Sequence, residues 1–217
     1  MLRITEIFFS IQGEARYVGL PSVFVRLTGC PMRCVYCDSA YAFHGGEKRS
    51  IEQILEEVQQ YETPYITVTG GEPLAQPECV DLLKQLCDRQ LTVSIETGNA
   101  MSIAEIDPRV HVVLDIKTPD SGEESNNRYD NLAFIKPTDQ LKFVICSRAD
   151  YEWSKEMVAH EELDQRCEIL FSPAAEQLSA KNLAEWILED QVPVRFQMQL
   201  HKPVSYTHLT LPTKRIV

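Results

Sequence analysis

Short apolar runs alternate with amphipathic segments along most of the chain. Seven runs rich in β-branched and aromatic residues predict strands, at 22–27, 65–69, 91–96, 110–117, 140–146, 168–171 and 194–199. Between them, apolar residues recur at helical spacing and predict helices at 50–61, 77–90, 149–160 and 179–190. Ser50 and Gln53 form a capping-box pattern, which marks the start of the first of these helices.

This alternation predicts a parallel sheet covered by helices, because strands buried on both faces are apolar almost throughout. Seven strands in 217 residues are few for a complete eight-fold barrel, which takes about 250 residues. The residues alone leave two α/β architectures open, an incomplete β/α barrel and a doubly wound sheet. In both, functional groups gather at the C-terminal ends of the strands.

Charge and composition limit the partners and the cellular location that we expect for the protein. The chain has 21 Lys and Arg against 32 Asp and Glu, a net charge of −11, which argues against binding nucleic acid or an anionic membrane. No apolar run approaches the roughly 20 residues of a membrane span, and Glu6 interrupts any signal-peptide core. We expect a cytoplasmic protein with a single domain over 1–202. The polar segment 119–131 predicts a surface loop.

Three of the seven cysteines lie close together, as Cys30, Cys34 and Cys37 directly after the strand at 22–27. Thiolates on one short loop can converge on a soft metal. A zinc site wants four ligands and would have to borrow Asp38 or His44. A 4Fe–4S cluster held by three cysteines has one iron open to a small molecule. The other cysteines are predicted to be buried thiols in a reducing compartment: Cys79, Cys87, Cys146 and Cys167.

A second motif, Thr-Gly-Gly-Glu-Pro at 69–73, ends the strand at 65–69. Two glycines let a backbone approach a ligand closely, and Glu72 could meet an ammonium group. By itself the motif also fits a tight turn. Its place at a strand end, beside the cysteine motif, favours a role in the site.

Together the two motifs resemble those of the radical S-adenosylmethionine enzymes, with Tyr36 as the aromatic residue of C-x3-C-x-aromatic-C. Three further segments are similar to the 7-carboxy-7-deazaguanine synthase family, and the likeness extends to about Lys202. They are Ile-Phe-Phe-Ser-Ile-Gln-Gly-Glu at 7–14, Cys-Asp-Ser at 37–39 and Gln-Leu-His-Lys at 199–202. The resemblance implies an incomplete parallel β/α barrel of the radical SAM type.

The resemblance also implies the reaction. The family's enzymes are lyases that convert 6-carboxy-5,6,7,8-tetrahydropterin to 7-carboxy-7-deazaguanine with loss of ammonia, in queuosine and 7-deazapurine biosynthesis. Cys30, Cys34 and Cys37 would hold a 4Fe–4S cluster whose open iron binds S-adenosylmethionine. A 5′-deoxyadenosyl radical, rather than a side chain, would take the hydrogen from C6, so no catalytic side chain is expected.

Further residues are expected at the cofactor. Gly71 would line its methionine moiety. Ser39 matches a family position, usually Thr, that meets Mg²⁺, and Na⁺ is an alternative ion there. Glu96, Asp115, Lys117 and Ser172 lie at or just after predicted strand ends, where functional groups are expected. The expected cofactor contacts are therefore Gly71, Glu72, Glu96, Asp115, Lys117 and Ser172.

Substrate contacts follow from the resemblance and fit a carboxylated pterin. The planar guanidinium of Arg26 matches a carboxylate, and Glu14 with the neighbouring backbone could pair with the pyrimidinone edge. The alternatives are a surface cation for Arg26, a solvated loop acid for Glu14 and an exposed histidine at 201. The expected substrate contacts are Ile11, Gln12, Gly13, Glu14, Arg26, Thr69 and His201.

The resemblance implies an electron donor such as flavodoxin or ferredoxin, and a homodimer. Two rival functions remain at this point, a glycyl-radical activating enzyme and a zinc-binding module without catalysis. Residues 203–217 depart from the family pattern and are basic where the rest of the chain is acidic. We interpret them as foreign sequence, in place of a C-terminal ending that would close over the substrate.

Overall fold

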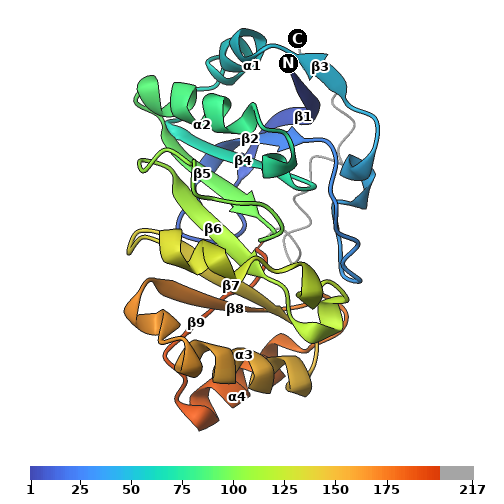
Figure 1. The fold of residues 1–217 in the computed structure, drawn as a ribbon, viewed down its shortest axis with the longest axis vertical. Coiled ribbons are helices and arrows are strands. Elements are labelled where there is room, and N and C mark those ends of the chain that lie inside the picture. The colour runs from blue at the N-terminus through green and yellow to red at the C-terminus, as the bar shows by residue number, and fades with distance from the viewer. Residues whose placement is uncertain (201–217) are drawn as a thin grey trace.

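In the computed structural model, which describes residues 1–200, one nine-stranded sheet runs through the whole fold (Figure 1). The strands are β1 (Leu2–Ile11), β2 (Pro21–Leu27), β3 (Glu47–Arg49), β4 (Tyr65–Gly70), β5 (Thr92–Thr97), β6 (His111–Ile116), β7 (Gln140–Ile145), β8 (Glu168–Pro173) and β9 (Arg195–Phe196). The α-helices are α1 (Ile51–Val58), α2 (Cys79–Asp88), α3 (Arg148–His160) and α4 (Ala180–Asp190). Six 3₁₀ helices complete the described residues: η1 (Ala40–Phe43), η2 (Pro73–Ala75), η3 (Pro119–Ser121), η4 (Glu124–Asn126), η5 (Tyr129–Phe134) and η6 (Leu163–Gln165).

The strand order distinguishes the two architectures that the sequence leaves open. The order is β3-β1-β2-β4-β5-β6-β7-β8-β9, and every pair from β2 to β9 is parallel. A doubly wound sheet reverses its strand order at a switch point. Here the order rises steadily along the chain from β1 to β9, apart from the three-residue β3, which lies at the edge beside β1. The sheet does not close, since β3 and β9 are its two edges. The fold is therefore the expected incomplete β/α barrel.

The predicted helices all form, and the seven predicted strands form with bounds shifted by a few residues at most. At the start of α1, the Gln53 N–H donates to Ser50 Oγ at 3.2 Å and the Ser50 N–H donates to Gln53 Oε1 at 2.9 Å, which confirms the capping box. Two strands were not predicted. β1 pairs antiparallel with β2 through a bulge between Ile4 and Glu6, which breaks the alternation that marks a strand. β3 has three residues, all charged.

The prediction of a surface loop at 119–131 is wrong in part. The segment forms η3, η4 and the start of η5, and Ser121 and Asn131 are fully buried. The Val35 N–H donates to the Ser121 carbonyl at 3.0 Å, and the Asn131 amide bonds Asn99 and Met101. Polar groups buried in this way need partners inside the protein, so parts of the segment pack against the fold instead of lying in solvent.

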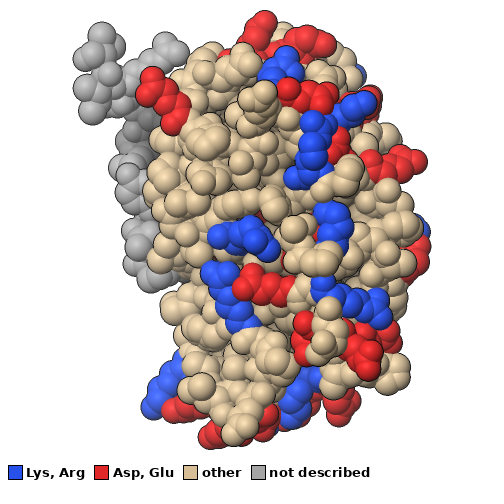
Figure 2. All heavy atoms as spheres, turned by 90° about the vertical axis from the view of Figure 1, so that its left-hand side faces the viewer, with Lys and Arg blue, Asp and Glu red and all other residues tan. Residues whose placement is uncertain are grey.

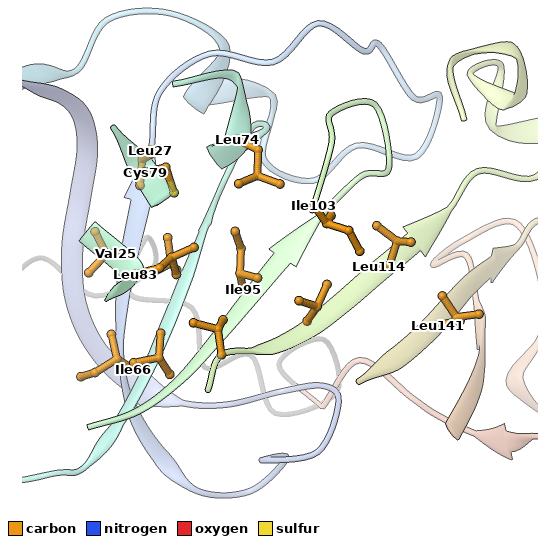
Figure 3. Packing of buried hydrophobic residues seen from close by; sticks show 14 of the residues in the cluster. Val25, Leu27, Ile66, Leu74, Cys79, Leu83, Ile95, Ile103, Leu114 and Leu141 are labelled. Carbon is orange, nitrogen blue, oxygen red and sulfur yellow. The ribbon is translucent and has the colours of Figure 1, made fainter. Parts of the chain in front are cut away.

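The main core lies between the sheet and the helices on its outer face (Figure 3). Leu83 on α2 is fully buried against this face, near Ile66 on β4 and Ile95 on β5. The four cysteines outside the cluster motif are buried free thiols, as predicted. No helix in the described residues is long and apolar enough to cross a bilayer. On the face shown in Figure 2, basic side chains lie among acidic ones, without a broad patch of one sign.

The inner face of the sheet is covered differently. Val113 on β6 and Leu170 on β8 pack against Ala15, which belongs to the β1–β2 loop, residues 12–20. The Ala15 N–H donates to Gln197 Oε1 at 2.9 Å, and the Arg16 N–H donates to the Gln140 Oε1 at 2.8 Å. These contacts hold Ala15 and Arg16, in the middle of the β1–β2 loop, against the inner face of the sheet.

Core packing predicts a contrast between two leucines. Leu83→Ala should lower the free energy of unfolding by about 2–5 kcal/mol, because it leaves a cavity beneath α2. Leu188→Ala on α4, where the side chain is 75% exposed, should change it by less than about 0.5 kcal/mol. Urea unfolding followed by circular dichroism measures both. Equal losses in the two variants would contradict this assignment of the core.

Candidate active site

A cavity of about 300 Å³ opens at the C-terminal ends of the parallel strands and reaches into the barrel. Its walls come from the cysteine loop (residues 28–39), the β1–β2 loop, η1, side chains of β1, β2 and β7, and the ends of β4, β5, β6 and β8. The strand-end rule used on the sequence therefore holds for this protein.

The cysteine loop is fastened to the fold through its backbone. The Gly29 N–H donates to the Ala42 carbonyl at 2.8 Å, and Arg33 donates from its guanidinium to the Cys30 carbonyl at 2.8 Å. Burial raises the pKa of Cys30, and raises the pKa of Cys34 to about 11. Uncoordinated, these thiols would stay protonated at neutral pH, so a metal must displace their protons to bind.

The arrangement of the cysteines bears on which metal they suit. Nowhere in residues 1–200 do three or more His, Cys, Asp or Glu side chains come close enough to hold a single metal ion. The described residues thus do not form a zinc site with Asp38 or His44. In a 4Fe–4S cluster each thiolate binds a different iron, so three sulfurs spread over one half-buried loop suit it better.

The two glycines after β4 bring the strand end against the cysteine loop. A Cβ on Gly71 would overlap the Gly29 carbonyl and lie 2.7 Å from Cys30 Cβ, and one on Gly70 would lie 2.5 Å from the Leu27 carbonyl. The Gly71 N–H donates to that Leu27 carbonyl at 3.2 Å. The sequence predicts that these two glycines let the backbone come close to a ligand. Both line the cavity, but the close contact of Gly71 is with the cysteine loop and that of Gly70 is with the end of β2.

Glu72 is fully buried behind the cavity wall rather than in it. Its carboxylate accepts hydrogen bonds from the Thr97 hydroxyl at 2.9 Å, the Gly98 N–H at 2.8 Å and the Leu74 N–H at 3.0 Å. Burial raises the pKa of Glu72, and these donors oppose that shift. The side chain joins the turns after β4 and β5, so this geometry favours a positioning role over the expected contact with an ammonium group.

Glu96 lies at the centre of a hydrogen-bond network at the end of β5. It accepts from the Gln12 amide at 3.2 Å and from the Thr69 hydroxyl at 3.2 Å, and the Gln12 amide also donates to Thr67 at 3.0 Å. Burial raises the pKa of Glu96 and the charge of Glu14 raises it further, whereas Lys142 opposes both. The sequence-predicted contacts from the β1–β2 loop, β4 and β5 are thus one connected group.

A row of alternating charges crosses the cavity beside this network. Lys142 on β7 forms an ion pair with Glu14, and its ammonium lies 3.9 Å from Asp115. Lys117 pairs with Asp115 at 3.1 Å. Burial lowers the pKa of both lysines, but the neighbouring carboxylates outweigh burial and hold each pKa above its usual value. Within the described residues Asp115 Oδ1 is buried without a hydrogen-bond partner.

Arg26 faces the cavity rather than the solvent, since its side chain is 15% exposed. Its Nε donates to Glu6 at 2.8 Å, and Tyr41 donates to the same carboxylate at 2.7 Å. The guanidinium lies 5.7 Å from the ring centres of Phe8 and Tyr41. Among the described residues only Nε is hydrogen-bonded, so the two terminal nitrogens are available to a ligand.

Most of the expected site residues meet in this one cavity. Ser172 does not line it: its hydroxyl is buried without a partner in the described part of the chain, and Ala174 and Ala175 line the cavity instead. His201 lies outside the described residues. The expected residues that line the cavity are Ile11, Gln12, Gly13, Glu14, Arg26, Cys30, Cys34, Cys37, Ser39, Thr69, Gly71, Glu96, Asp115 and Lys117.

Sequence reasoning missed Lys142, whose signal was present as a charged residue in the otherwise apolar run Leu-Lys-Phe-Val-Ile. A lysine buried in a strand needs an acidic partner, which points to a polar interior. It also missed Gln199, which donates to Glu14 Oε1 at 2.7 Å. Glu6 and Tyr41 were missed because the contact with Arg26 joins distant segments.

Comparison with known proteins decides the family. The model of the Radical SAM superfamily matches residues 24–158. The chain is 45% identical over 204 residues to the 7-carboxy-7-deazaguanine synthase of Chlorobaculum tepidum, with 93% of each chain covered. It is 40% identical over 216 residues to that of Koribacter versatilis, with 93% of this chain and 96% of the relative covered. The chain belongs to the 7-carboxy-7-deazaguanine synthase family of radical SAM enzymes.

Solved structures agree on the fold of this synthase-family chain. The crystal structure of QueE from Escherichia coli superposes with a TM-score of 0.76 at 24% identity, over 92% of this chain and 94% of that one. SuiB from Streptococcus suis, solved with S-adenosylmethionine bound, gives 0.54 at 16% identity, over 79% of this chain and 45% of that one. Likeness at this identity supports the barrel fold and nothing finer.

As a radical SAM enzyme of this family, the protein has a 4Fe–4S cluster and S-adenosylmethionine as its cofactors. The residues present fit them, on two observations. The cysteine loop carries three half-buried thiols, and the neighbouring cavity has a buried, unpartnered oxygen on Asp115 among the described residues. The rival reading as a zinc module is wrong, and the match to synthases argues against a glycyl-radical activating enzyme.

Because Gly71 lies so close to the cysteine loop, adding a methyl group at this position should disturb the site. Gly71→Ala should lower the free energy of unfolding by about 1–3 kcal/mol and reduce the iron bound after anaerobic reconstitution, because the cysteine loop must move. Gly98→Ala is the matched control, since its Cβ would meet the flexible end of Met32 rather than backbone. Iron and sulfide analysis with thermal unfolding measures the difference. A Gly71→Ala protein with full iron would refute the positioning role.

Proposed function

We propose that this protein converts 6-carboxy-5,6,7,8-tetrahydropterin to 7-carboxy-7-deazaguanine and ammonia, as a step in queuosine or 7-deazapurine biosynthesis. The observation that carries the proposal is the single cavity in which the cysteine loop faces both the Gln12–Glu14 segment and Arg26. Relatives named as this synthase, similar over almost their whole length, support it. The reaction balances: both C–N bonds of one ring nitrogen are broken and one C–C bond forms to close the smaller ring. That N–H group departs as ammonia, together with two hydrogens that were on the neighbouring ring carbons.

In this proposal Cys30, Cys34 and Cys37 bind the cluster. When bound, the cluster and S-adenosylmethionine supply a carbon-centred radical able to take a hydrogen atom from the substrate. The protein's part is to hold the reacting molecules in one orientation and to exclude water. The backbone bonds of the cysteine loop and the Gly71 contact serve the first of these tasks.

We assign the cofactor to the strand ends nearest the cysteine loop. Gly71 offers a surface without a side chain, and Lys117 with Asp115 offers opposite charges that suit a zwitterionic amino acid. We assign Glu96 as a further cofactor contact, on the side of the cofactor that faces the substrate. Glu72 acts from behind the lining, by holding the turns after β4 and β5. The Ser172 hydroxyl, which has no partner among the described residues, stays a proposed cofactor contact.

We assign the substrate to the inner part of the cavity. Arg26 directs its terminal nitrogens to the substrate carboxylate, because Glu6 already holds Nε and fixes the plane of the fork. The Glu14 carboxylate accepts from the amino-substituted edge of the ring. The remaining contacts would come from Ile11, Gln12, Gly13 and Thr69, together with His201, which lies outside the described residues.

A hard metal ion fits beside the cysteine loop. Ser39 and Asp38 both line the cavity, and the Ser39 hydroxyl lies 3.8 Å from the sulfur of Cys37. Oxygen donors of this kind suit Mg²⁺, with the substrate and water completing its shell. We propose Mg²⁺ at Ser39, and Na⁺ as the ion to test against it.

The surroundings of the reaction are also part of the proposal. One-electron reduction of the cluster needs a donor such as flavodoxin or ferredoxin. The free thiols of all seven cysteines suit a reducing compartment, which supports a cytoplasmic location. Members of the family are expected to act as homodimers. We propose one domain over 1–202, with 203–217 as foreign sequence, and these last residues lie outside the described part of the chain.

The deciding experiment is anaerobic reconstitution with iron and sulfide, followed by incubation with a reductant, S-adenosylmethionine, Mg²⁺ and the tetrahydropterin. Mass spectrometry should detect the deazaguanine acid. Cys34→Ala should abolish the brown colour and the product, because a cluster ligand is lost. Cys146→Ala, a buried cysteine that does not line the cavity, should keep both.

Two outcomes would count against the proposal. Cleavage of S-adenosylmethionine without deazaguanine product would point to another substrate, and adding a native-type C-terminal ending would test whether residues 203–217 are the cause. Unchanged iron content in Cys34→Ala would refute the assignment of the cluster ligands.

A further inference from the structure

Lys142 is the one lysine in residues 1–200 whose ammonium contacts carboxylates on both the substrate side and the cofactor side of the cavity. It projects from the middle of β7, with a side chain 12% exposed. Glu14 on the β1–β2 loop is its ion-pair partner, and Asp115 on β6 lies 3.9 Å away. The roles proposed above for the cavity residues do not use Lys142.

The contact with Glu14 fixes a carboxylate that would otherwise sit on a loop. Lys142 binds Glu14 Oε2, and the Gln199 amide donates to Glu14 Oε1 at 2.7 Å. The Glu14 N–H donates to the Gln12 side chain at 3.2 Å, so the backbone of the residue is held as well. Together these contacts hold the carboxylate and the backbone of Glu14 in one orientation.

We propose that Lys142 is a positioning and specificity-determining residue: it holds Glu14 as an ionised acceptor and thereby selects 2-amino pteridines over 2-oxo pteridines. This inference rests on the proposed function, because it assumes that the pteridine ring lies against Glu14.

The selection follows from hydrogen-bond chemistry. The edge of a pterin presents two neighbouring donors, the ring N3–H and the 2-amino group. An ionised carboxylate accepts from both and gains a charge-assisted pair. A 2-oxo pteridine, or lumazine, keeps the N3–H but turns an oxygen toward the carboxylate, so the second contact becomes repulsive. Discrimination requires that Glu14 carry its charge and point one way.

Lys142 supplies both requirements at once. An ammonium in contact favours the ionised form of a carboxylate in a nearly buried site. Its second contact, with Asp115, ties its own position to β6 rather than to the loop. Of the groups that line the cavity near Glu14, Asp115 and Glu96 are acidic and would oppose that ionisation if Lys142 were absent.

The test compares ligands that differ at one position. Pterin-6-carboxylate and lumazine-6-carboxylate are titrated against the reconstituted enzyme by ligand fluorescence. The wild-type protein should prefer the pterin by about 100-fold or more, because the wrong partner leaves buried polar groups unpaired. Lys142→Met should bring the preference below about 10-fold by weakening pterin binding. Lys142→Arg should restore most of it.

Two controls separate this role from a general loss of structure. Lys155→Met removes a lysine of α3 that pairs with Glu152 and Asp190 outside the cavity, and it should keep the wild-type preference. If Lys142→Met fails to fold, the double variant Lys142→Met/Glu14→Gln replaces it, since it buries no unpaired charge. That variant should also have lost the preference.

A pH profile gives a second readout, through Glu96. Its pKa is raised by burial and by Glu14, and Lys142 lowers it again. Lys142→Met should raise the pKa of Glu96 further, so the acidic limb of kcat/KM should move to higher pH. The groups that face Glu96 are Gln12 and Glu14 on the β1–β2 loop, Arg26 on β2, Thr69 on β4 and Lys142 on β7.

The outcomes are distinct from those of the proposed function. A wild-type enzyme that binds neither pteridine and forms no deazaguanine would overturn both proposals. A wild-type enzyme that forms the product while Lys142→Met keeps its preference for pterin and its pH profile would overturn this inference alone.

Discussion

The close contact between the end of β4 and the cysteine loop is the constraint on which the rest of the site depends. Leu27 and Gly29 each offer a carbonyl to the turn after β4, and the N–H groups of Gly71 and Glu72 take them at 3.2 and 2.8 Å. A Cβ on Gly71 would overlap the Gly29 carbonyl, so this contact requires a glycine at that position. The contact fixes the distance between the thiols and the strand ends, and so the space in which a cluster and its ligand can meet.

The row of alternating charges inside the barrel contributes more to the specificity of ligand binding than to the stability of the fold. Burying an ion pair returns little net free energy, whereas removing one partner of such a pair costs about 3–5 kcal/mol. Glu14, Asp115 and Glu96 come from three parts of the fold. Lys117, directly after β6, and Lys142 on β7 neutralise them. Apolar side chains would fill this space at lower cost. Charges held there make sense for a polar, charged ligand that must be bound in one orientation.

How much of this could be predicted from the sequence depends on the range of the interaction. Helix α1 was predicted with its cap, because Ser50 and Gln53 act within one turn. The parallel strands were predicted because burial on both faces leaves apolar runs. β1 was not, since its bulge and half-buried faces hide the alternation. The fold of segment 119–131 depends on partners such as Val35 and Asn99, which its own composition does not reveal.

The site shows the same division. The cysteine and glycine motifs are local, and the sequence placed both correctly at strand ends. The pairings of Glu14 with Lys142 and of Arg26 with Glu6 join residues far apart in the chain, so only the fold could show them. Glu72 was the instructive case: a glutamate in a glycine turn suggested a ligand contact. In the structure, the Glu72 carboxylate instead accepts hydrogen bonds from the N–H groups of Leu74 and Gly98, which need an acceptor because they are buried or partly buried.

An incomplete barrel explains why the β1–β2 loop carries so much of the site. A closed barrel fills its interior with side chains from its own strands, whereas an open sheet leaves that interior to be covered by something else. Here Ala15 packs on Val113 and Leu170 from that loop, in a left-handed conformation with φ of 61°, which an alanine adopts at some cost. The Gln197 and Gln140 side chains hold it there. The strain lies next to Glu14, so the same loop that closes the barrel also sets the direction of the carboxylate held by Lys142.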